Sequence, residues 1–306
     1  MSNTVMIIDG NSICRAAHNG TKLTVGKIQT QAIFGTIRTV RGLIEKYPGA
    51  KILILWDGKA QWRKAIYPDY KGNRKPKDAK AAAHDDAYKA QSAFVRKSLQ
   101  LLGVRQMFAL THEADDMAGV FSQRLSKAGN PILLVTRDHD WLQLINPNVR
   151  WYSPIDDYLV DTNSFTKFTG YFGIDAFLEG KAIQGDTSDN IAGIDRVGKG
   201  TAPKILAEFG SMEKFYSQCD SGVFKPRLKI HTNLNAPEGR EIFKRNMKLM
   251  DLRNVPTPDS KDIVIIQPEY NEEKFRLLCE KLAFVSILRN FDTSVYPFKK
   301  LSAKAA

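Results

Sequence analysis

Nine acidic residues of this 306-residue chain occupy positions from which they could act together. They are Asp9, Asp57, Glu113, Asp115, Asp116, Asp138, Asp140, Asp186 and Asp189. Asp9, Asp57, Asp138 and Asp140 come after short apolar runs that have the character of buried strands. Because the carboxyl ends of parallel strands meet at one edge of a sheet, we expect these carboxylates to converge there.

A cluster of this many carboxylates indicates hard metal ions. Carboxylates in contact cannot all stay ionised unless cations neutralise them. The three cysteines are far apart and the five histidines show no ligand spacing, and oxygen-only ligation favours Mg²⁺ or Mn²⁺ over zinc. Two such ions about 4 Å apart can activate water against a phosphodiester. Any one acid alone could be a turn residue or a helix cap, but the set of nine favours metal-assisted phosphate chemistry.

A strongly basic segment separates the second strand run from the next helix pattern. Residues 59–97 hold eleven Lys or Arg against four Asp, within a chain whose net charge is +12. Tyr67 and Tyr70 are interleaved with these cations. Cations neutralise phosphates and aromatic rings stack on bases, so the segment favours a nucleic-acid partner over a merely solvated loop. Its first part, residues 65–86, has few apolar anchors, and we expect it to be exposed and mobile.

The elements that must position these residues alternate along the chain. Apolar runs predict strands at Val5–Ile8, Ile52–Trp56, Val104–Phe108, Ile132–Val135, Arg150–Tyr152 and Ile263–Ile266. Helix patterns lie at Gln29–Lys46, Gln91–Leu102, Glu113–Lys127 and Asn271–Asn290, and helix signals resume near Phe165. Short apolar strands alternating with helices predict a mainly parallel sheet covered on both faces.

The chain changes character near residue 181, where helical, Gly-rich and basic sequence begins. We therefore predict an α/β domain over residues 1–180 and a helical, basic region over residues 181–300, ending in a frayed tail at 301–306. The composition is that of a globular protein, with 43% hydrophobic and 25% charged residues. No apolar run approaches the roughly 20 residues of a membrane span, and no signal peptide precedes the first strand. We expect a cytoplasmic protein with no membrane partner.

Other chemistries lack their usual motifs in this sequence. There is no GxSxG, no P-loop and no GxGxxG after a strand. The cysteine spacing excludes a disulfide scaffold and a structural zinc site. Besides metal-assisted cleavage of a phosphodiester, two alternatives remain at this point. One is a small-molecule phosphatase that uses Asp138 and Asp140 with Mg²⁺, and the other is a non-catalytic module that binds branched DNA.

Six segments together resemble the 5′ nuclease superfamily of flap endonucleases and 5′–3′ exonucleases, especially its bacterial and phage members. They are IIDGNS (7–12), WDGK (56–59), YPDYKGNR (67–74), EADDMA (113–118), TRDHDWLQL (136–144) and QGDTSDNIAGI (184–194). They occur in the family's order across about two thirds of the chain. The resemblance implies a PIN-like α/β nuclease domain with two Mg²⁺ sites, at which Mn²⁺ can substitute, and it makes all nine acids metal ligands or near-ligands.

The same resemblance assigns roles to residues of the basic segment. Lys71 and Arg74 match cations that contact the scissile phosphate, and with Asp138 they are the expected catalytic residues. Tyr70 matches an aromatic beside the cleaved nucleotide, and Lys64 and Lys75 are further expected substrate contacts. Residues 60–100 would form a helical arch that collects a single-stranded 5′ end.

The helical region resembles the family's helix–hairpin element, over about residues 189–210, which grips duplex phosphates and often a K⁺ ion. Arg196, Gly198 and Lys199 are the expected substrate contacts there. The chain departs from the usual pattern, since Arg196 stands where glycine is common and Gly200 where lysine is common. An Arg cannot copy a glycine conformation cheaply.

The resemblance implies a stand-alone, monomeric, Mg²⁺-dependent 5′–3′ exonuclease and 5′-flap endonuclease. Its expected substrates are DNA with a free 5′ end, flaps and duplex junctions, and RNA–DNA hybrids as a further class. Primer or flap removal in replication, or recombination, would use such an activity. A catalytically weak branched-DNA-binding protein of the same fold is the alternative.

Overall fold

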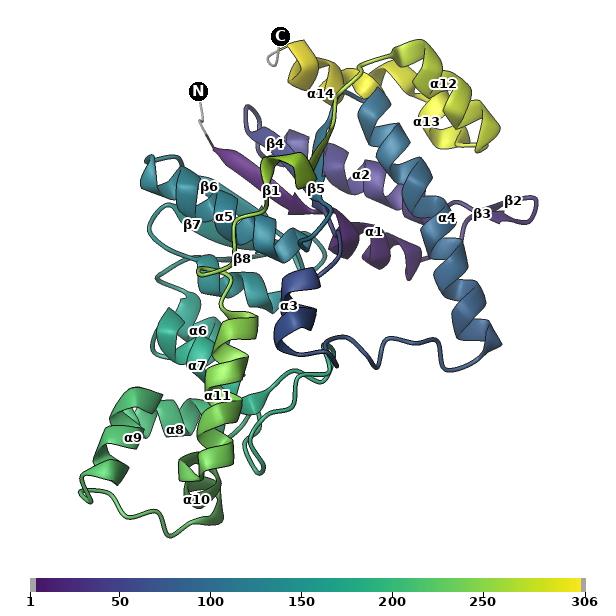
Figure 1. Cartoon of the computed structure of the whole chain (residues 1–306). Coiled ribbons are helices and arrows are strands. Elements are labelled where there is room, and N and C mark those ends of the chain that lie inside the picture. Colours follow the sequence, from purple (N-terminus) through teal and green to yellow (C-terminus); the bar gives the residue numbers. More distant parts are fainter. Residues whose placement is uncertain (1–3, 304–306) are drawn as a thin grey trace.

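A seven-stranded sheet forms the centre of the molecule (Figure 1). The structure is a computed structural model that describes residues 4–303. The strands of the sheet are β1 (Val5–Asp9), β4 (Lys51–Trp56), β5 (Arg105–Ala109), β6 (Ile132–Val135), β7 (Val149–Ser153), β8 (Tyr158–Val160) and β9 (Ile263–Ile266). Their order is β8-β7-β6-β1-β4-β5-β9. The five inner strands run parallel, and the edge strands β8 and β9 pair antiparallel to their neighbours. The expected mainly parallel α/β sheet is confirmed.

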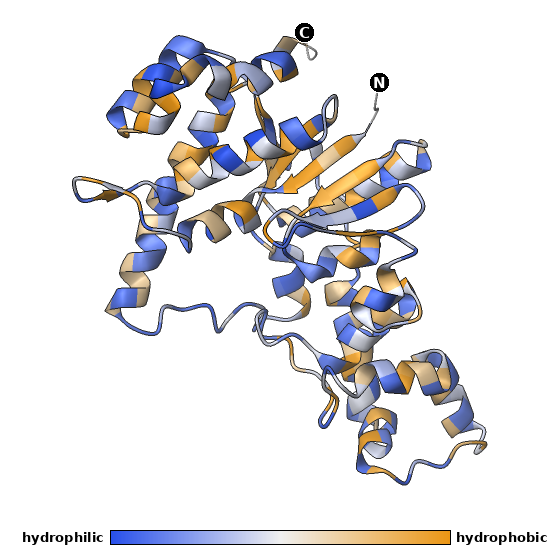
Figure 2. Ribbon diagram, turned by 180° about the vertical axis from the view of Figure 1, so that it is seen from behind, coloured by the Kyte–Doolittle hydropathy of each residue, from blue (hydrophilic) through white to orange (hydrophobic). Residues whose placement is uncertain are grey.

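Helices cover both faces of this sheet because successive strand residues point to opposite sides. In β1, Met6 and Ile8 face one hydrophobic core while Ile7 faces the other. The first core packs against α1 (Gly10–His18), α2 (Gln31–Lys46), α4 (Ala79–Leu101), α12 (Glu272–Lys281), α13 (Val285–Arg289) and α14 (Phe291–Ala303). The second packs against α5 (Ala114–Lys127), the 3₁₀ helix η1 (His139–Leu144) and the helical region. Figure 2 shows the resulting apolar strands between helices with polar outer faces.

The helical region extends away from the sheet in Figure 1. It consists of α6 (Phe165–Thr169), α7 (Ile174–Gln184), α8 (Ala202–Phe209), α9 (Met212–Asp220), α10 (Lys229–Asn235) and α11 (Pro237–Met250). After α11 and the short η2 (Ser260–Asp262), the chain returns to the sheet as β9, and α12–α14 bury Phe275, Phe291 and Phe298 in the first core. The predicted helical region at 181–300 is therefore too long at its end, since residues 263–303 belong to the α/β body.

Two helix boundaries also differ from the sequence predictions. The single helix expected over 271–290 is two helices, because Ala283 turns the chain with a left-handed φ of 48° so that Phe284 and Ile287 become buried. The tail expected at 301–306 is helical as far as Ala303, and residues 304–306 lie outside the described part. Within residues 4–303, none of the helices has the length and hydrophobicity of a bilayer-spanning segment.

The basic segment forms a short helix, an extended loop and a long helix. α3 (Gln61–Ile66) precedes the loop at 67–78, and α4 begins after Asp78, whose carboxylate accepts from the Ala81 N–H at 2.7 Å. The helix begins twelve residues earlier than predicted, because this cap and an alanine-rich stretch favour helix without any apolar face. Residues 79–86 lie on the surface with little burial. Two short strands, β2 (Thr24–Val25) and β3 (Ile28–Gln29), form a separate hairpin before α2.

Candidate active site

The carboxyl ends of β1, β4 and β6 place three acids at one edge of the sheet. Asp9 ends β1 and caps α1, accepting from the Ser12 N–H at 2.9 Å and the Thr136 hydroxyl at 2.8 Å. Asp57 follows β4 and accepts from the Ala114 N–H at 2.9 Å. Asp138 follows β6 and caps η1. The parallel register thus brings together the acids that the sequence placed after separate strands, as predicted.

A glycine allows the chain after β4 to reach this edge. Gly58 donates to the His112 carbonyl at 2.9 Å, and a Cβ at Gly58 would lie 1.8 Å from the Ala109 carbonyl oxygen. Only glycine permits so close an approach without shifting the backbone. The WDG sequence is therefore needed to position Asp57 beside the first turn of α5.

The first turn of α5 holds an ion-pair cluster that is almost fully buried. Arg63 Nη2 lies 2.7 Å from Asp116 Oδ1, and its Nη1 lies 3.2 Å from Glu113 Oε2. Asp116 Oδ2 also accepts from the Glu113 N–H at 2.9 Å, which closes a capping box. Asp116 is 0% exposed and occupied by these partners. These contacts hold α5 and α3 together, and the role of Asp116 as a metal ligand or near-ligand stays a prediction.

Glu113 and Asp189 bind the cations expected to contact the phosphate. Lys71 Nζ forms a very short ion pair with Glu113 and lies 3.7 Å from Asp189. Arg74 Nη2 lies 2.5 Å from Asp189 Oδ1. Lys71 has a left-handed φ of 56°, and its N–H donates to the Asp189 carbonyl at 2.8 Å, so the loop backbone fixes its position. Half of the Arg74 side chain remains exposed.

Tyr70 is not presented as an open stacking surface. It is 3% exposed, and its hydroxyl donates to Glu113 at 2.7 Å and to Asp189 at 3.0 Å. Burial raises the pKa of Tyr70 far above its usual range, so the hydroxyl stays protonated as a donor. The hydroxyl of Tyr70 thus orients Glu113 and Asp189, and its place beside the cleaved nucleotide stays a prediction.

A lysine that the sequence reading missed pairs with the acids of the helical region. Lys181, on α7, forms a very short ion pair with Asp140 and lies 3.8 Å from Asp186. Asp186 also accepts from the Ser188 hydroxyl and N–H, each at 2.7 Å. Gly185 starts this turn with a φ of 76°, and a Cβ there would lie 2.3 Å from the Gly193 nitrogen. The turn brings Asp186 back toward the sheet edge.

A small cavity of about 10 Å³ shows that the acids of both regions meet. Asp115, Asp140, Asp186 and Asp189 all line it. Asp115 accepts from the Trp141 indole N–H at 2.7 Å, which fixes it across from η1. Four of the nine acids thus share this cavity, and the metal-binding role of the set of nine stays a prediction.

The pKa shifts divide the site into acids whose pKa is raised and acids whose pKa is lowered. Burial, and then the charge of Asp57, raise the pKa of Asp9 to about 7. Burial, and then the charge of Asp138, raise the pKa of Asp115 well above its usual range. The surrounding protein also raises the pKa of Asp57 and of Asp138, although both side chains reach solvent. None of these four acids forms an ion pair with a lysine or arginine of residues 4–303, so burial is the main cause of their raised pKa values.

The compensated acids show the opposite shift. Burial alone would raise the pKa of Glu113, yet Lys71 and Arg63 hold it below its ordinary value. Burial would likewise raise the pKa of Asp186, and the Ser188 hydroxyl with Lys181 lowers it. Burial would lower the pKa of Lys71, but Glu113 and Asp189 raise it. Lys71 therefore remains charged across the physiological range.

The four uncompensated acids fit hard divalent cations by their chemistry. Their donor set consists of carboxylate oxygens alone, which suits Mg²⁺ or Mn²⁺, and the raised pKa values show a charge that the protein does not neutralise. Among residues 4–303, no three acidic, histidine or cysteine side chains already gather closely enough to hold an ion. The fit is one of charge and ligand type.

Sequence reasoning missed the residues that fix the acids. Arg63 was counted with the surface cations, but it is 3% exposed and its Nε donates to the Leu249 carbonyl at 2.9 Å. Asn11, in the IIDGNS segment, donates to Asp57. Thr136 bridges Asp9 and the Asp138 N–H. The two residues inside the motifs carried a signal, whereas Arg63 and Lys181 carried none that distinguished them from exposed lysines and arginines.

The hairpin between α7 and α8 keeps an open backbone. A Cβ at Gly198 or Gly200 would have nothing within 4 Å, so a ligand could approach either backbone closely. Arg196 adopts a left-handed φ of 67°, the conformation that glycine favours and that we expected an Arg to avoid. The strain costs about 1–2 kcal/mol. Arg196 and Lys199, like Lys64 and Lys75 of the basic segment, lie on or near the surface.

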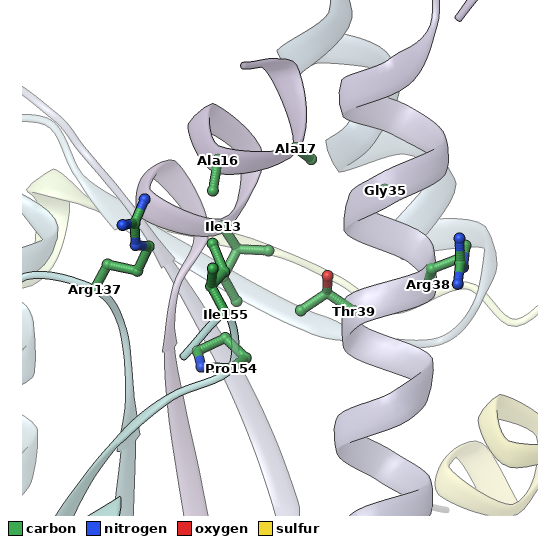
Figure 3. A pocket seen from close by; sticks show the side chains of 9 residues that line it. All are labelled: Ile13, Ala16, Ala17, Gly35, Arg38, Thr39, Arg137, Pro154 and Ile155. Carbon is green, nitrogen blue, oxygen red and sulfur yellow. The ribbon is translucent and has the colours of Figure 1, made fainter. Parts of the chain in front are cut away.

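A larger hollow lies apart from the acids, between α1, α2 and the β7–β8 turn (Figure 3). Its volume is about 360 Å³. Ile13 and Thr39 line its base, with Arg137 and Arg38 on opposite sides in this view. No carboxylate lines it, so it is separate from the acidic site.

Two family models match the chain. The family model "5′-3′ exonuclease, N-terminal resolvase-like domain" matches residues 4–171, and "5′-3′ exonuclease, C-terminal SAM fold" matches residues 174–270. The chain is 27% identical over 302 residues to DNA polymerase I of Streptococcus pneumoniae, covering 91% of this chain and 32% of that one. The chain thus spans about a third of the length of that relative.

Solved structures show the same fold. The T5 D15 protein, co-crystallised with metal ions, is 25% identical, with a TM-score of 0.70 over 82% of this chain and 90% of that one. A complex of bacteriophage T5 D15 flap endonuclease with DNA and metal ions is 24% identical, with a TM-score of 0.70 over the same shares of the two chains.

Proposed function

This chain belongs to the 5′–3′ exonuclease family, and on that premise we propose that it is a Mg²⁺-dependent, structure-specific 5′ nuclease of DNA. The family's exonucleases and flap endonucleases are metal-dependent hydrolases, as the T5 protein crystallised with metal ions illustrates. The observation that carries the proposal is the juxtaposition of uncompensated carboxylates with Lys71 and Arg74 at one sheet edge. The carboxylates are complementary to metal ions, and Lys71 and Arg74 are complementary to a phosphate.

The chain's own residues would divide the work as follows. Asp9, Asp57, Asp115 and Asp138 would hold two Mg²⁺ ions, with Asp140 and Asp186 beside them. When bound, such ions activate water and neutralise the charge of the reacting phosphate. Lys71 and Arg74 bind the non-bridging phosphate oxygens and stabilise the charge that develops on them. Glu113, Asp189 and Tyr70 hold these two cations in place.

Substrate selection would come from shape and strand polarity. Residues 60–100, with Lys64 and Lys75, would collect the free 5′ strand, and the hairpin at Arg196, Gly198 and Lys199 would bind duplex phosphates. Phosphate contacts carry no base information, so cleavage should depend on structure and on salt. We propose that the substrates are 5′ flaps and duplex junctions of DNA and that the chain acts as a monomer. Processing of RNA–DNA hybrids, K⁺ at the hairpin and a cytoplasmic location stay predictions.

A cleavage assay on a 5′-flap duplex, labelled at either end, tests the proposal. A blunt duplex and a single strand serve as comparison substrates, with Mg²⁺ or with EDTA. We expect Mg²⁺-dependent cuts from the 5′ side near the flap junction. Tight, salt-sensitive binding without cutting in Mg²⁺ or Mn²⁺ would contradict the nuclease and support a branched-DNA-binding protein. Hydrolysis of a simple phosphomonoester without DNA cleavage would support a phosphatase.

A further inference from the structure

The loop between α9 and α10 presents three cations that no acid neutralises. Lys225 and Arg227 lie in this loop and Lys229 opens α10. All three are exposed, and none lies within ion-pair distance of a carboxylate anywhere in residues 4–303. Two arginines of the same region are already paired, since Arg240 binds Asp220 and Arg253 binds Asp175. The loop therefore carries a local positive charge that is free to bind an anion.

Packing of Phe224 holds this loop against the helices. Its ring lies 4.9 Å from that of Phe209, 5.9 Å from that of Phe215 and 5.3 Å from that of His231. The Phe224 N–H also donates to the Gln218 carbonyl at 2.9 Å. Phe224 fixes the backbone of the loop from which the three cations project. The fixed backbone lowers the conformational entropy that the loop loses when the cations bind a ligand.

The same surface continues to the hairpin expected to grip duplex DNA. Asn233 Nδ2 donates to the Asp195 carbonyl at 3.2 Å and to its carboxylate at 3.1 Å, which places α10 beside the hairpin. Lys229 lies four residues before Asn233 and so shares its helix face. The cations of the loop and Arg196 thus bound one stretch of surface, along which a polyanion could run.

Two exposed apolar residues flank the cations. Val223 is 79% exposed and Leu228 is 62% exposed. Apolar side chains beside phosphate-binding cations can contact sugar faces in a groove of duplex DNA. In Figure 1 the loop lies at the tip of the helical region, farther from the sheet edge than the α7–α8 hairpin.

We propose that residues 223–229 form a second duplex-binding element, which contacts DNA phosphates farther from the cleavage junction than the α7–α8 hairpin does. This inference rests on the proposed nuclease function. It adds that tight binding requires a duplex arm long enough to reach residues 223–229. Three phosphate contacts would steepen the salt dependence of binding by about 3 in the slope of log K against log salt. This additional salt dependence appears only when the duplex is long enough to reach residues 223–229.

The test compares flap substrates whose downstream duplex arms are about 10 and about 20 base pairs, one and two helical turns. Affinity is measured against KCl concentration in EDTA, for the wild type and for the Lys225→Ala, Arg227→Ala, Lys229→Ala triple variant. We expect the variant to lose about 3 from the salt slope on the long arm and nothing on the short arm. The triple variant Lys51→Ala, Lys127→Ala, Lys281→Ala removes the same charge from exposed sites elsewhere and should match the wild type on both arms.

Equal slopes for wild type and loop variant on the long arm would overturn the inference, as would equal losses on both arms. Arg227→Glu alone gives a second readout, with a larger loss of long-arm affinity than Arg227→Ala. The proposed nuclease function is judged separately, by flap cleavage of the wild type in Mg²⁺. Normal cleavage with no arm-length effect removes only the second element, whereas a long-arm salt effect without any cleavage removes the nuclease.

Discussion

The acids of the site form two groups that the fold treats differently. Glu113, Asp116 and Asp189 bind Lys71, Arg63 and Arg74, and Asp140 binds Lys181. Asp9, Asp57, Asp115 and Asp138 form no ion pair with a lysine or arginine of residues 4–303, and their pKa values are raised. The first group is neutralised inside the protein, while the second leaves negative charge for an outside cation.

This difference separates folding from chemistry. Buried acids with protein partners position loops and helices, and removing either partner leaves an uncompensated charge. Acids that form no ion pair with a lysine or arginine destabilise the site when no metal ion is bound, and they therefore favour the binding of divalent cations. A residue's group predicts which measurement responds when it is changed: stability for the paired acids, and metal-dependent cleavage for the others.

The largest effect is expected at an acid without a partner. Asp138→Asn should lower the cleavage rate by a hundredfold to a thousandfold or more, on the order of losing one preorganised charged group. DNA affinity in EDTA should change little, because Asp138 offers no cation to phosphates. Single-turnover cleavage and equilibrium binding on the same flap substrate measure both. Cleavage comparable to the wild type would end the assignment of Asp138 to the metal group.

A change at the paired group should affect stability. Arg63→Met leaves Asp116 and Glu113 buried without their shared cation, so the free energy of unfolding should fall by about 3–5 kcal/mol. Urea unfolding in EDTA measures it. Lys64→Met is the matched control. Lys64 is the exposed neighbour of Arg63, so its substitution should change the free energy of unfolding by no more than about 0.5 kcal/mol. Similar losses in both variants would break the distinction between buried and surface cations in α3.

Lys71 links the two groups, because it pairs with Glu113 and also faces the expected phosphate. Lys71→Ala should slow single-turnover cleavage by about a hundredfold and weaken substrate binding much less, because its charge acts mainly on the reacting phosphate. Arg63 and Tyr70 still bind Glu113 in this variant. Equal losses in rate and in affinity would contradict a role in the chemical step.

The pH dependence of stability should reveal the unpaired group. In EDTA, the folded state holds a proton on Asp9 up to its pKa of about 7, whereas the unfolded carboxyl loses it near its ordinary pKa of 3.8. The folded state therefore binds more protons between these values, and stability must fall as pH rises. Asp9 should contribute a loss of about 2 kcal/mol between pH 5 and pH 7.

Unfolding curves of the wild type and of Asp9→Asn across this pH range isolate that contribution. The variant should have a flatter profile, and saturating Mg²⁺ should flatten the wild-type profile too, because the ion replaces the proton. A wild-type profile that rises with pH in EDTA, or one unchanged by Asp9→Asn, would show that Asp9 has another source of compensation.

The local patterns were informative wherever one strand or one motif decided the outcome. The runs at Ile132–Val135 and Ile263–Ile266 are strands with the predicted bounds. Asp9, Asp57 and Asp138 meet because parallel register carries strand ends to one edge. Hydrophobic alternation did not predict the start of α4, since its first turns are exposed and depend on the Asp78 cap and alanine propensity.

The amino-acid sequence by itself determined the parallel sheet, the convergence of acids at one of its edges and the excess of cations beside them, because these follow from short-range periodicity and residue type. Only the tertiary structure decided which acids were already neutralised. Arg63 lies fifty or more residues from Glu113 and Asp116, and Lys181 more than forty from Asp140. Such pairings, like the burial of Tyr70, depend on how side chains from distant segments pack together, and a local sequence pattern does not predict this packing.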